Sequence, residues 1–328
     1  MRESLQQLCN NFITNRNTVN STFKWENDLL VAAGSTVFFN RNAVADAAKL
    51  ENCKKMLKEN VGIFSNFRGN VELPLVCMLA VSDCPEKKLQ KTKKYYDVLK
   101  QEFSGSEYLV LAAAVLADMV PEEQVVRMAE KARSIYNKMK KDHPFLTSSE
   151  DSVYAVLMAV SEKSDEVLME EMEVAYKQLK EHFSSSNEVQ ALAHVLSIAE
   201  GGVDEKCNKV VALYDALRDA DVKYGKYHEL VVLASLALLP VEQRVLVEDI
   251  KAVDAFLADQ KGYGFFGLDK KARLMHAAMI VSADYTKNEN TEIAAMAGTL
   301  AAVAAQQAAM CAVIAASAAA SSAAASGN

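Results

Sequence analysis

Hydrophobic positions along this chain alternate between two kinds of predicted helix. One kind is apolar on nearly every side, as in Leu75 to Val81 and Leu230 to Leu239, and such a helix is expected to lie buried between neighbours. The other kind is amphipathic. From Val125 to Met139, apolar residues recur every three or four positions among Arg, Lys and Glu, which predicts one buried and one exposed face. We call the first kind helix A and the second kind helix B.

A five-residue phrase recurs in the B helices. It begins at Tyr96, Tyr136, Tyr176 and Tyr214, with a diverged copy at Val253, so the successive steps are 40, 40, 38 and 39 residues. A period of this size is typical of stacked helical hairpins, because one hairpin cannot bury its apolar face alone. We also expect the four tyrosines to occupy equivalent, largely buried positions in the shared core.

The predicted fold is therefore all-α. It is a superhelical stack of about six antiparallel hairpins, similar to a HEAT or TPR solenoid, because the repeat length is about 40 residues. We assign residues 1–290 to this helical-repeat domain, with residues 1–20 as an N-terminal capping helix. Residues 291–328 form a separate tail. The pattern leaves open whether the stack is an open arc or a closed ring.

The tail is rich in alanine and carries no charge after Glu292. Alanine is the strongest helix former, and the larger residues follow a spacing of three and four that is typical of a helix-pairing seam. The seam consists of Ile293, Met296, Leu300, Val303, Met310 and Ile314. Its partner is the repeat body or another subunit, and the spacing favours self-association between subunits. A membrane span is a further alternative, although Gln306 and Gln307 at its middle argue against it.

Composition limits the class of protein. Half of the residues are hydrophobic and only five are proline, which allows a large helical core. The net charge is −7, and no basic stripe is present, so we expect no nucleic-acid partner. The six cysteines are scattered without a CxxC pair and are interpreted as reduced core thiols. The N-terminal residues lack the apolar core of a signal peptide, which predicts a cytoplasmic protein.

The predicted loops are of two types. Loops from helix A to helix B are short and acidic, as in Ser164–Glu166, and are typical of ordinary helix starts. Loops from helix B to helix A are rich in aromatic, histidine, hydroxyl and glycine residues, as in His143–Asp151 and Tyr224–Glu229. In a stack of hairpins all loops of the second type emerge at one edge. We call this edge the B-to-A rim.

The B-to-A rim has a structural and a functional interpretation. Structurally, its Phe residues pack back on the preceding helix, Ser and Asn cap the next helix, and Gly ends the previous one. Functionally, the rim binds a peptide or a small polar ligand, because binding groups often lie on loops held by a rigid scaffold. The candidate binding residues are Arg68, His143, His182, Tyr227, His228 and Tyr263.

Three of these candidates are histidines in successive rim loops, but we predict no metal site. Metal ligation needs donor atoms within about 2 Å of one ion, whereas neighbouring hairpins stand about 10 Å apart. His194 and His276 lie inside A helices, where we expect core histidines with satisfied hydrogen bonds. The sequence contains no GxGxxG after a strand, no P-loop, no HExxH and no GxSxG. We therefore predict no catalytic residue and no cofactor.

Two function classes follow. The first, which we favour, is a non-enzymatic helical-repeat scaffold that binds a protein or peptide at the B-to-A rim or on a concave face. The alternative is an enzyme on a closed α/α toroid, with a pocket under the same loops. An open arc would favour the scaffold, and a closed ring around a deep polar pocket would favour the enzyme.

Four segments resemble a known bacterial family, the domain of unknown function 4003. These segments are Phe64–Asn70, His143–Ser148, Lys223–Leu230 and Arg273–Met279. The resemblance extends over nearly the whole chain. It implies a bacterial cytosolic protein of Firmicutes type, and it brings no activity, substrate or catalytic residue.

Removal of the tail would separate its packing alternatives. If the seam joins two subunits, a chain ending at Thr291 should be a monomer while the full chain is a dimer, since the seam is the contact. If the seam packs on the chain's own helices, the mass should stay the same and the stability should fall. Light scattering and thermal unfolding measure the two quantities. Full-length protein found only in the membrane fraction would contradict both alternatives.

Overall fold

The computed structural model describes residues 1–38, 43–227, 229–264, 267–287, 310–311 and 313–314. These residues form fourteen α-helices and two short 3-10 helices. They contain no strand, only an isolated bridge between Tyr263 and Leu268. The prediction of an all-α protein is confirmed. The predicted domain boundary at residue 290 lies outside the described residues.

The chain divides into two compact units. Unit 1 contains Met1–Cys9 and Lys131–Ala309, and unit 2 contains Asn10–Glu130 and Met310–Asn328. Two helices cross the division, α1 (Glu3–Thr22) and α7 (Val125–Asp142). The first nine residues of the chain thus belong to the same compact unit as its C-terminal helices.

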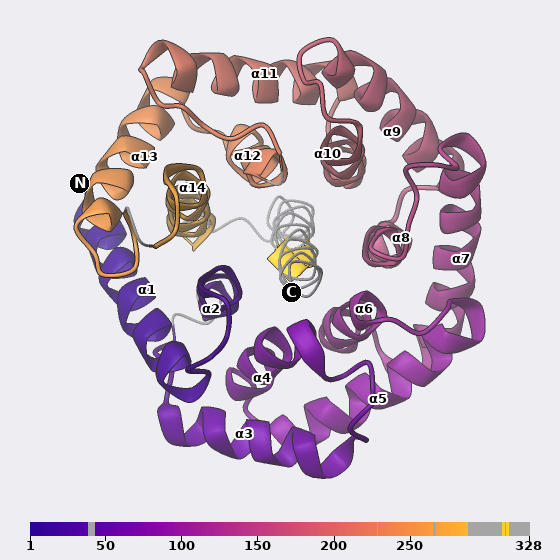
Figure 1. The fold of residues 1–328 in the computed structure, drawn as a ribbon. Coiled ribbons are helices and arrows are strands. Elements are labelled where there is room, and N and C mark those ends of the chain that lie inside the picture. Colours follow the sequence, from indigo (N-terminus) through magenta and orange to yellow (C-terminus); the bar gives the residue numbers. More distant parts are fainter. Residues whose placement is uncertain (39–42, 228, 265–266, 288–309, 312, 315–328) are drawn as a thin grey trace, which may run out of the picture. The chain divides into compact units, whose positions relative to one another are not determined.

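Unit 2 alternates B and A helices. After α1 it contains α2 (Asp28–Thr36), α3 (Ala47–Asn60), α4 (Glu72–Ala80), α5 (Pro85–Glu102) and α6 (Glu107–Met119). The A helix α4 packs between α2 and α6, and the B helix α3 packs against α5 (Figure 1). Unit 2 thus has an A row and a B row.

Unit 1 has the same arrangement. Following α7 it contains α8 (Asp151–Val160), α9 (Asp165–Lys180), α10 (Ser186–Ile198), α11 (Val203–Asp219), α12 (Glu229–Ala237), α13 (Gln243–Ala258) and α14 (Lys270–Lys287). The A helices α8, α10, α12 and α14 contact one another in succession, as do the B helices α9, α11 and α13 (Figure 1). Each of these three B helices also packs on the A helix that follows it.

Burial follows the predicted division into two kinds of helix. Every residue of α12 is buried, and so is every residue of α6 from Leu109 to Ala117. The B helix α7 instead buries a single stripe, which includes Ala132, Ile135 and Met139. The A helices therefore form the core, and the B helices cover it with one face each.

The prediction for the recurring tyrosines is right for one of the four. Tyr96 is buried, whereas Tyr136, Tyr176 and Tyr214 are half-buried. The residue before each of them is the one that enters the core, because it lies at the centre of the buried stripe. Three of the tyrosine rings instead contact side chains of rim loops. The pairs are Tyr96 with Phe67, Tyr176 with His143, and Tyr214 with Phe183.

A lysine in each of the B helices α3, α5 and α7, five residues before the phrase in α5 and α7, joins that helix to the A helix that follows it. Lys49 Nζ donates to the Ser82 carbonyl, and Lys131 Nζ donates to the Ser161 carbonyl at 2.9 Å. Lys91, at the equivalent position of α5, donates to the carbonyls of Ala117 in the last turn of α6 and of Val120 just after it. The last carbonyls of a helix have no partner inside the helix, and a cation there also interacts favourably with the helix dipole. We call these residues the capping lysines.

Arg2 connects the start of the chain to α13 and α14 within unit 1. Its Nη2 lies 2.8 Å from Asp249 Oδ2, and its Nη1 lies 2.7 Å from Asp284 Oδ2. The guanidinium lies over the Tyr285 ring, and the Tyr285 hydroxyl donates to Asp249. Both aspartates are buried. One cation thus serves two buried carboxylates that lie more than 240 residues away in sequence.

Five of the six cysteines are buried and Cys84 is half-buried, and none forms a disulfide. Among the described helices, none is long and apolar enough to cross a membrane. The tail seam is described only in part. Met310 and Ile314 are buried, whereas Ile293, Met296, Leu300 and Val303 lie outside the described residues.

Replacing Arg2 tests the connection to α13 and α14. We expect Arg2→Ala to lower the free energy of unfolding by about 2 to 3 kcal/mol, because two buried carboxylates lose their cation. Arg218→Ala is the control, since it removes only exposed pairs and should cost about 1 kcal/mol or less. Urea unfolding measures both. Equal effects of the two substitutions would contradict the interpretation.

Candidate functional site

In two B helices, the last residue of the recurring phrase donates hydrogen bonds to the rim loop that follows. Lys140 Nζ donates to the carbonyls of Pro144 and Thr147, both at 2.7 Å. Lys180 Nζ likewise donates to the Ser184 carbonyl at 2.6 Å. Lys140 and Lys180, at the ends of the B helices α7 and α9, therefore fix the loops that follow them.

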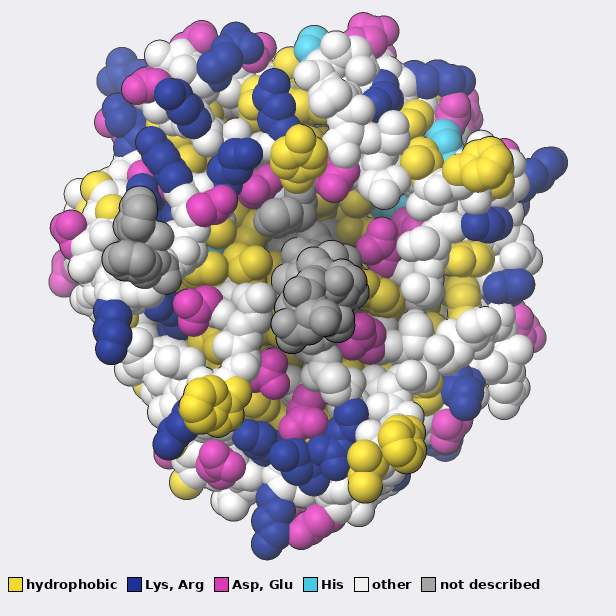
Figure 2. Space-filling model, in the orientation of Figure 1, with side chains coloured by type: hydrophobic (Ala, Val, Ile, Leu, Met, Phe, Trp, Pro, Cys, Tyr) yellow, Lys and Arg dark blue, Asp and Glu magenta, His cyan; other side chains and the backbone are white. Residues whose placement is uncertain are grey.

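Several rim loops present an exposed aromatic side chain. Trp25 and Phe145 are each 98% exposed, Phe64 is fully exposed, and Tyr227 is 54% exposed. They belong to the loops α1–α2, α7–α8, α3–α4 and α11–α12. On the face drawn in Figure 2, hydrophobic side chains project singly between charged ones. Among the described residues, the loops from A to B helices carry no exposed aromatic side chain.

Other aromatic residues of the rim follow the structural interpretation. Phe67, Phe103 and Phe183 are buried, and Phe103 and Phe183 follow directly after the last turns of α5 and α9. The loop between α3 and α4 contains both types, since Phe67 is buried and Phe64 is exposed. Sequence alone did not distinguish the two types, because both lie in similar Ser- and Gly-containing loops.

Arg68 lies in unit 2, just before α4. Its side chain is half-buried, and Nη1 lies 3.1 Å from Glu72 Oε2. Glu72 also pairs with Lys58 at the end of α3. Arg68 therefore contributes to an ion-pair cluster at the start of an A helix.

The other predicted binding residues lie in four different loops of unit 1. His143 is half-buried, with Nε2 2.9 Å from Glu173 Oε2, and His182 is exposed. Tyr227 is exposed, and His228 lies outside the described residues. Tyr263 is buried, and its hydroxyl lies 2.8 Å from His276 Nδ1. Of the described candidates in unit 1, His182 and Tyr227 are exposed to solvent.

Both core histidines are fully buried. His276 has a hydrogen-bond partner, as expected, whereas His194 has none. His194 is fully buried in α10, and neither ring nitrogen has a hydrogen-bond partner. Its Nδ1 lies 3.7 Å from Asp151 Oδ1, at the start of α8, and its ring contacts Tyr154. The Asp151 Oδ2 atom accepts the Ser148 backbone N–H at 2.7 Å. We call Asp151 and His194 the Asp–His pair.

Burial shifts both members of the Asp–His pair toward their neutral forms. It raises the pKa of Asp151 to about 7, with the Ser148 N–H opposing the shift. It lowers the pKa of His194 to about 3. Although the two side chains are close enough for an ion pair, we favour a neutral pair, because no other group compensates for the desolvation of His194. No sequence motif indicates this pair, since its members are 43 residues apart.

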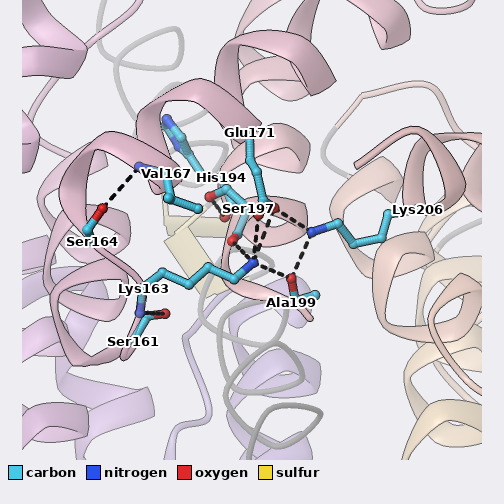
Figure 3. Close-up of polar contacts among 9 residues, drawn as sticks. All are labelled: Ser161, Lys163, Ser164, Val167, Glu171, His194, Ser197, Ala199 and Lys206. Atoms are coloured by element: carbon cyan, nitrogen blue, oxygen red, sulfur yellow. Dashed lines mark hydrogen bonds and ion pairs between the residues drawn. The ribbon is translucent and has the colours of Figure 1, made fainter. Parts of the chain in front are cut away.

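The opposite edge of unit 1 carries a charged cluster, shown in Figure 3, in which Lys206 is buried and Lys163 and Glu171 are half-buried. Lys163 Nζ donates to both Glu171 carboxylate oxygens and to the carbonyls of Ser197 and Ala199. Lys206 Nζ donates to Glu171 Oε2 at 2.6 Å and to Ala199. Burial lowers the pKa of Lys206, and Glu171 opposes that shift.

The cluster in Figure 3 has a structural explanation. Glu171 occupies the position in α9 that a capping lysine occupies in α3, α5 and α7. Lys163 and Lys206 instead reach the carbonyls at the end of α10, and Glu171 holds both ammonium groups. All partners of the two lysines are thus provided by the protein, and the cluster offers no free group for chemistry. No group of three or more potential metal ligands occurs among the described residues.

The fold and loops define a class of protein: an all-α chain with alternating buried and amphipathic helices and an exposed aromatic rim. The chain belongs to the family described as Protein of unknown function (DUF4003), whose model matches residues 15–309. It is similar to the uncharacterized protein YeaA of Bacillus subtilis strain 168. The two are 21% identical over 274 residues, which cover 80% of this chain and 81% of that protein. No solved structure shows a significant match.

The Asp–His pair gives a pH-dependent prediction. The folded pKa of Asp151 lies above its unfolded value of 3.8, so the folded state holds a proton that the unfolded state has lost. This contribution to stability is complete below about pH 4 and is lost as the pH rises through about 7. Asp151→Asn removes the effect. Relative to wild type, the variant should therefore become more stable between pH 5 and pH 8, by up to about 3 kcal/mol.

The lowered pKa of His194 has the opposite pH dependence, and it remains in the variant. The difference between the two proteins therefore isolates Asp151. Urea unfolding at the two pH values measures it, and Glu170→Gln on the exposed face of α9 is the control. A pH-independent difference for Asp151→Asn would show that the carboxyl group is already ionised in the folded protein.

Proposed function

We propose that this protein is a non-enzymatic, cytoplasmic helical-repeat scaffold that binds a protein or peptide partner at the B-to-A rim. The observation that carries the proposal is the exposure of Trp25, Phe64, Phe145 and Tyr227, all of them on loops that lead into A helices. Aromatic residues are enriched at the energetic centres of protein interfaces. The absence of a disulfide among the six cysteines supports a reducing compartment.

The exposed aromatics are not an unavoidable result of the loop geometry. Phe67, Phe103 and Phe183 show that a rim loop of this chain can bury a phenylalanine. Leaving Phe64 or Phe145 in water forgoes roughly 1.5 to 3 kcal/mol for each side chain. A partner that covers them would recover this free energy, which supports a binding role for the exposed set.

The support beneath the rim also favours binding. The A helices are buried on nearly all sides, and Lys140 and Lys180 hold the loop carbonyls in place. Ordered loops lose less conformational entropy when a partner binds. The exposed rings are therefore presented from a rigid base, which is the arrangement expected of a recognition surface.

The tail is proposed to pack on the chain's own helices. Met310 and Ile314 of the predicted seam are buried within one chain, together with Cys311 and Val313. This burial supports docking of the seam on the chain's own helices, the alternative ranked second by the spacing of the seam alone. Self-association through the remaining seam residues stays a prediction of the sequence.

The Asp–His pair supports a second candidate function, an enzyme on an α/α toroid with a site under the rim loops. A carboxyl group whose pKa is near 7 is suited to general acid–base catalysis, and perturbed pKa values are enriched at active sites. The pair lies beneath the α7–α8 loop, where the alternative places its pocket. It remains the second candidate because Asp151 and His194 are both buried.

Substitution of the exposed aromatics tests the scaffold. Phe145→Ser with Tyr227→Ser, and separately Trp25→Ser with Phe64→Ser, should weaken partner binding by about thirtyfold for each essential contact, which corresponds to roughly 2 kcal/mol. The matched control is Val126→Ser, Val167→Ser and Val245→Ser, which removes exposed apolar side chains near the starts of B helices. Partners are captured from native cells, and their binding is then measured by calorimetry.

The outcomes separate the two candidate functions. Loss of binding in both the rim variants and the control would contradict a rim-specific scaffold. Asp151→Asn should leave partner binding unchanged under the first candidate. If this substitution instead abolishes the turnover of a substrate while the rim variants remain active, the enzyme candidate is correct.

A further inference from the structure

A lysine-rich surface surrounds Tyr227 in unit 1. It is formed by the α11–α12 loop and by the start of α14, and all of its members are exposed. We call it the Tyr227 surface, and it consists of Lys223, Lys226, Tyr227, Lys270 and Lys271. Figure 2 shows Lys and Arg side chains gathered over the region of α11 to α14, at the upper left.

Contacts between rings and ammonium groups show that the two segments meet. Lys271 Nζ lies 5.7 Å from the centroid of the Tyr227 ring. Lys226 Nζ lies 5.8 Å from the centroid of the Tyr214 ring on α11. Tyr227 thus has one lysine next to it in sequence and another from α14 over its ring. The surface combines a half-exposed aromatic ring with positive charges from one rim loop and from the start of α14.

The lysines of the Tyr227 surface are exposed, and none is neutralised by a carboxylate among the described residues. None of the four forms an ion pair within the described part of the chain, whereas Lys88, Lys138 and Lys206 each pair with a carboxylate. Lys270 and Lys271 lie in the first turn of α14, whose start is capped by Asp269 through a 2.8 Å hydrogen bond from the Ala272 N–H to Asp269 Oδ1. The A helices α4, α6, α8 and α12 have an acidic residue inside their first turn instead. The four lysines therefore have no carboxylate partner among the described residues, and an anionic partner would provide one.

We propose that the Tyr227 surface binds an acidic segment of the partner protein, with partner carboxylates at the lysines and an aromatic or apolar side chain against Tyr227. The proposal rests on the scaffold function proposed above and names the chemistry of its partner. Opposite charges across an interface steer association and select the partner. A cation beside an aromatic ring further favours contact with a planar or apolar group.

The surrounding charges favour a short acidic peptide over a nucleic acid or a membrane. The whole chain has a net charge of −7, and exposed carboxylates lie close in sequence to these lysines, Asp219 and Asp221 just before Lys223 and Asp269 directly before Lys270. An extended polyanion would reach these carboxylates and be repelled. A short acidic segment can occupy the lysines alone.

Fluorescence anisotropy with defined probes tests the proposal on the full chain. The probe is a labelled peptide of alternating Glu and Tyr, and the comparison peptide has Gln in place of Glu. We expect the Glu peptide to bind with an affinity that falls as salt rises. Lys226→Gln with Lys271→Gln should weaken binding about tenfold, because each lysine contributes somewhat under 1 kcal/mol. Tyr227→Ser should weaken it as well.

The matched control is Lys209→Gln with Lys251→Gln. These exposed lysines of α11 and α13 lie outside the surface, and the control changes the net charge by the same amount. Binding should stay within about twofold of wild type, since only long-range attraction changes. Circular dichroism checks that all variants remain folded.

Three results would overturn the proposal. They are equal losses in the two lysine pairs, equal binding of the Glu and Gln peptides, and equally tight, Lys226-dependent binding of duplex DNA or phosphatidylglycerol vesicles. The scaffold function is judged separately. If the Glu peptide fails to bind while partner capture still depends on Phe145 and Tyr227, only the acidic chemistry is wrong. If capture is independent of the rim, the scaffold function itself fails.

Discussion

The buried A helices impose one constraint on which both edges of this protein depend: their end groups must find partners inside the protein. A helix leaves its first N–H groups and last carbonyls unpaired, and water does not reach them in a helix such as α12, which is buried throughout. At the carbonyl end, the capping lysines of neighbouring B helices supply the partners. At α10 the same task falls to Lys163 and Lys206, with Glu171 as their counter-ion.

The two edges therefore differ in which side chains remain available for binding. At the edge where A helices end, the capping lysines and also Lys163 and Lys206 donate to backbone carbonyls. At the edge where A helices begin, short side chains such as Ser106 provide the caps, and the loop residues beyond them are free to vary. The exposed rings of Phe145 and Tyr227 lie in loops that lead into A helices of unit 1, and that of Phe64 lies in such a loop of unit 2. The asymmetry thus follows from the chemistry of helix ends.

Much of this organisation can be predicted from local sequence patterns. The all-α class, the two kinds of helix and the two kinds of loop depend on hydrophobic spacing and on turn residues, which are local properties. The burial of the tyrosines was harder to predict, because Tyr136 lies one residue beyond the buried stripe, and helical spacing alone does not distinguish the centre of a stripe from its margin.

Contacts between distant segments could not be predicted from one sequence. Nothing near Arg2 indicates that Asp249 and Asp284 are its partners, and the apolar context of His194 suggested a satisfied core histidine. Tyr263 is a predicted ligand contact in a glycine-rich loop. The structure instead buries it against His276, which lies in the second turn of α14. Loop composition does not reveal whether a side chain points inward.

Residues in energetically unfavourable environments are concentrated at the rim of unit 1. Asp151 is a buried carboxyl beside an unsatisfied His194, Phe145 is left in water, and Lys270 and Lys271 begin a helix at its positive end. Natural sequences tend to break such local rules where function requires it. At the other edge of unit 1 the charges of Figure 3 are fully paired. A partner at the edge proposed for binding would cover the exposed Phe145 and supply anions to Lys270 and Lys271, whereas the buried Asp–His pair would stay out of its reach.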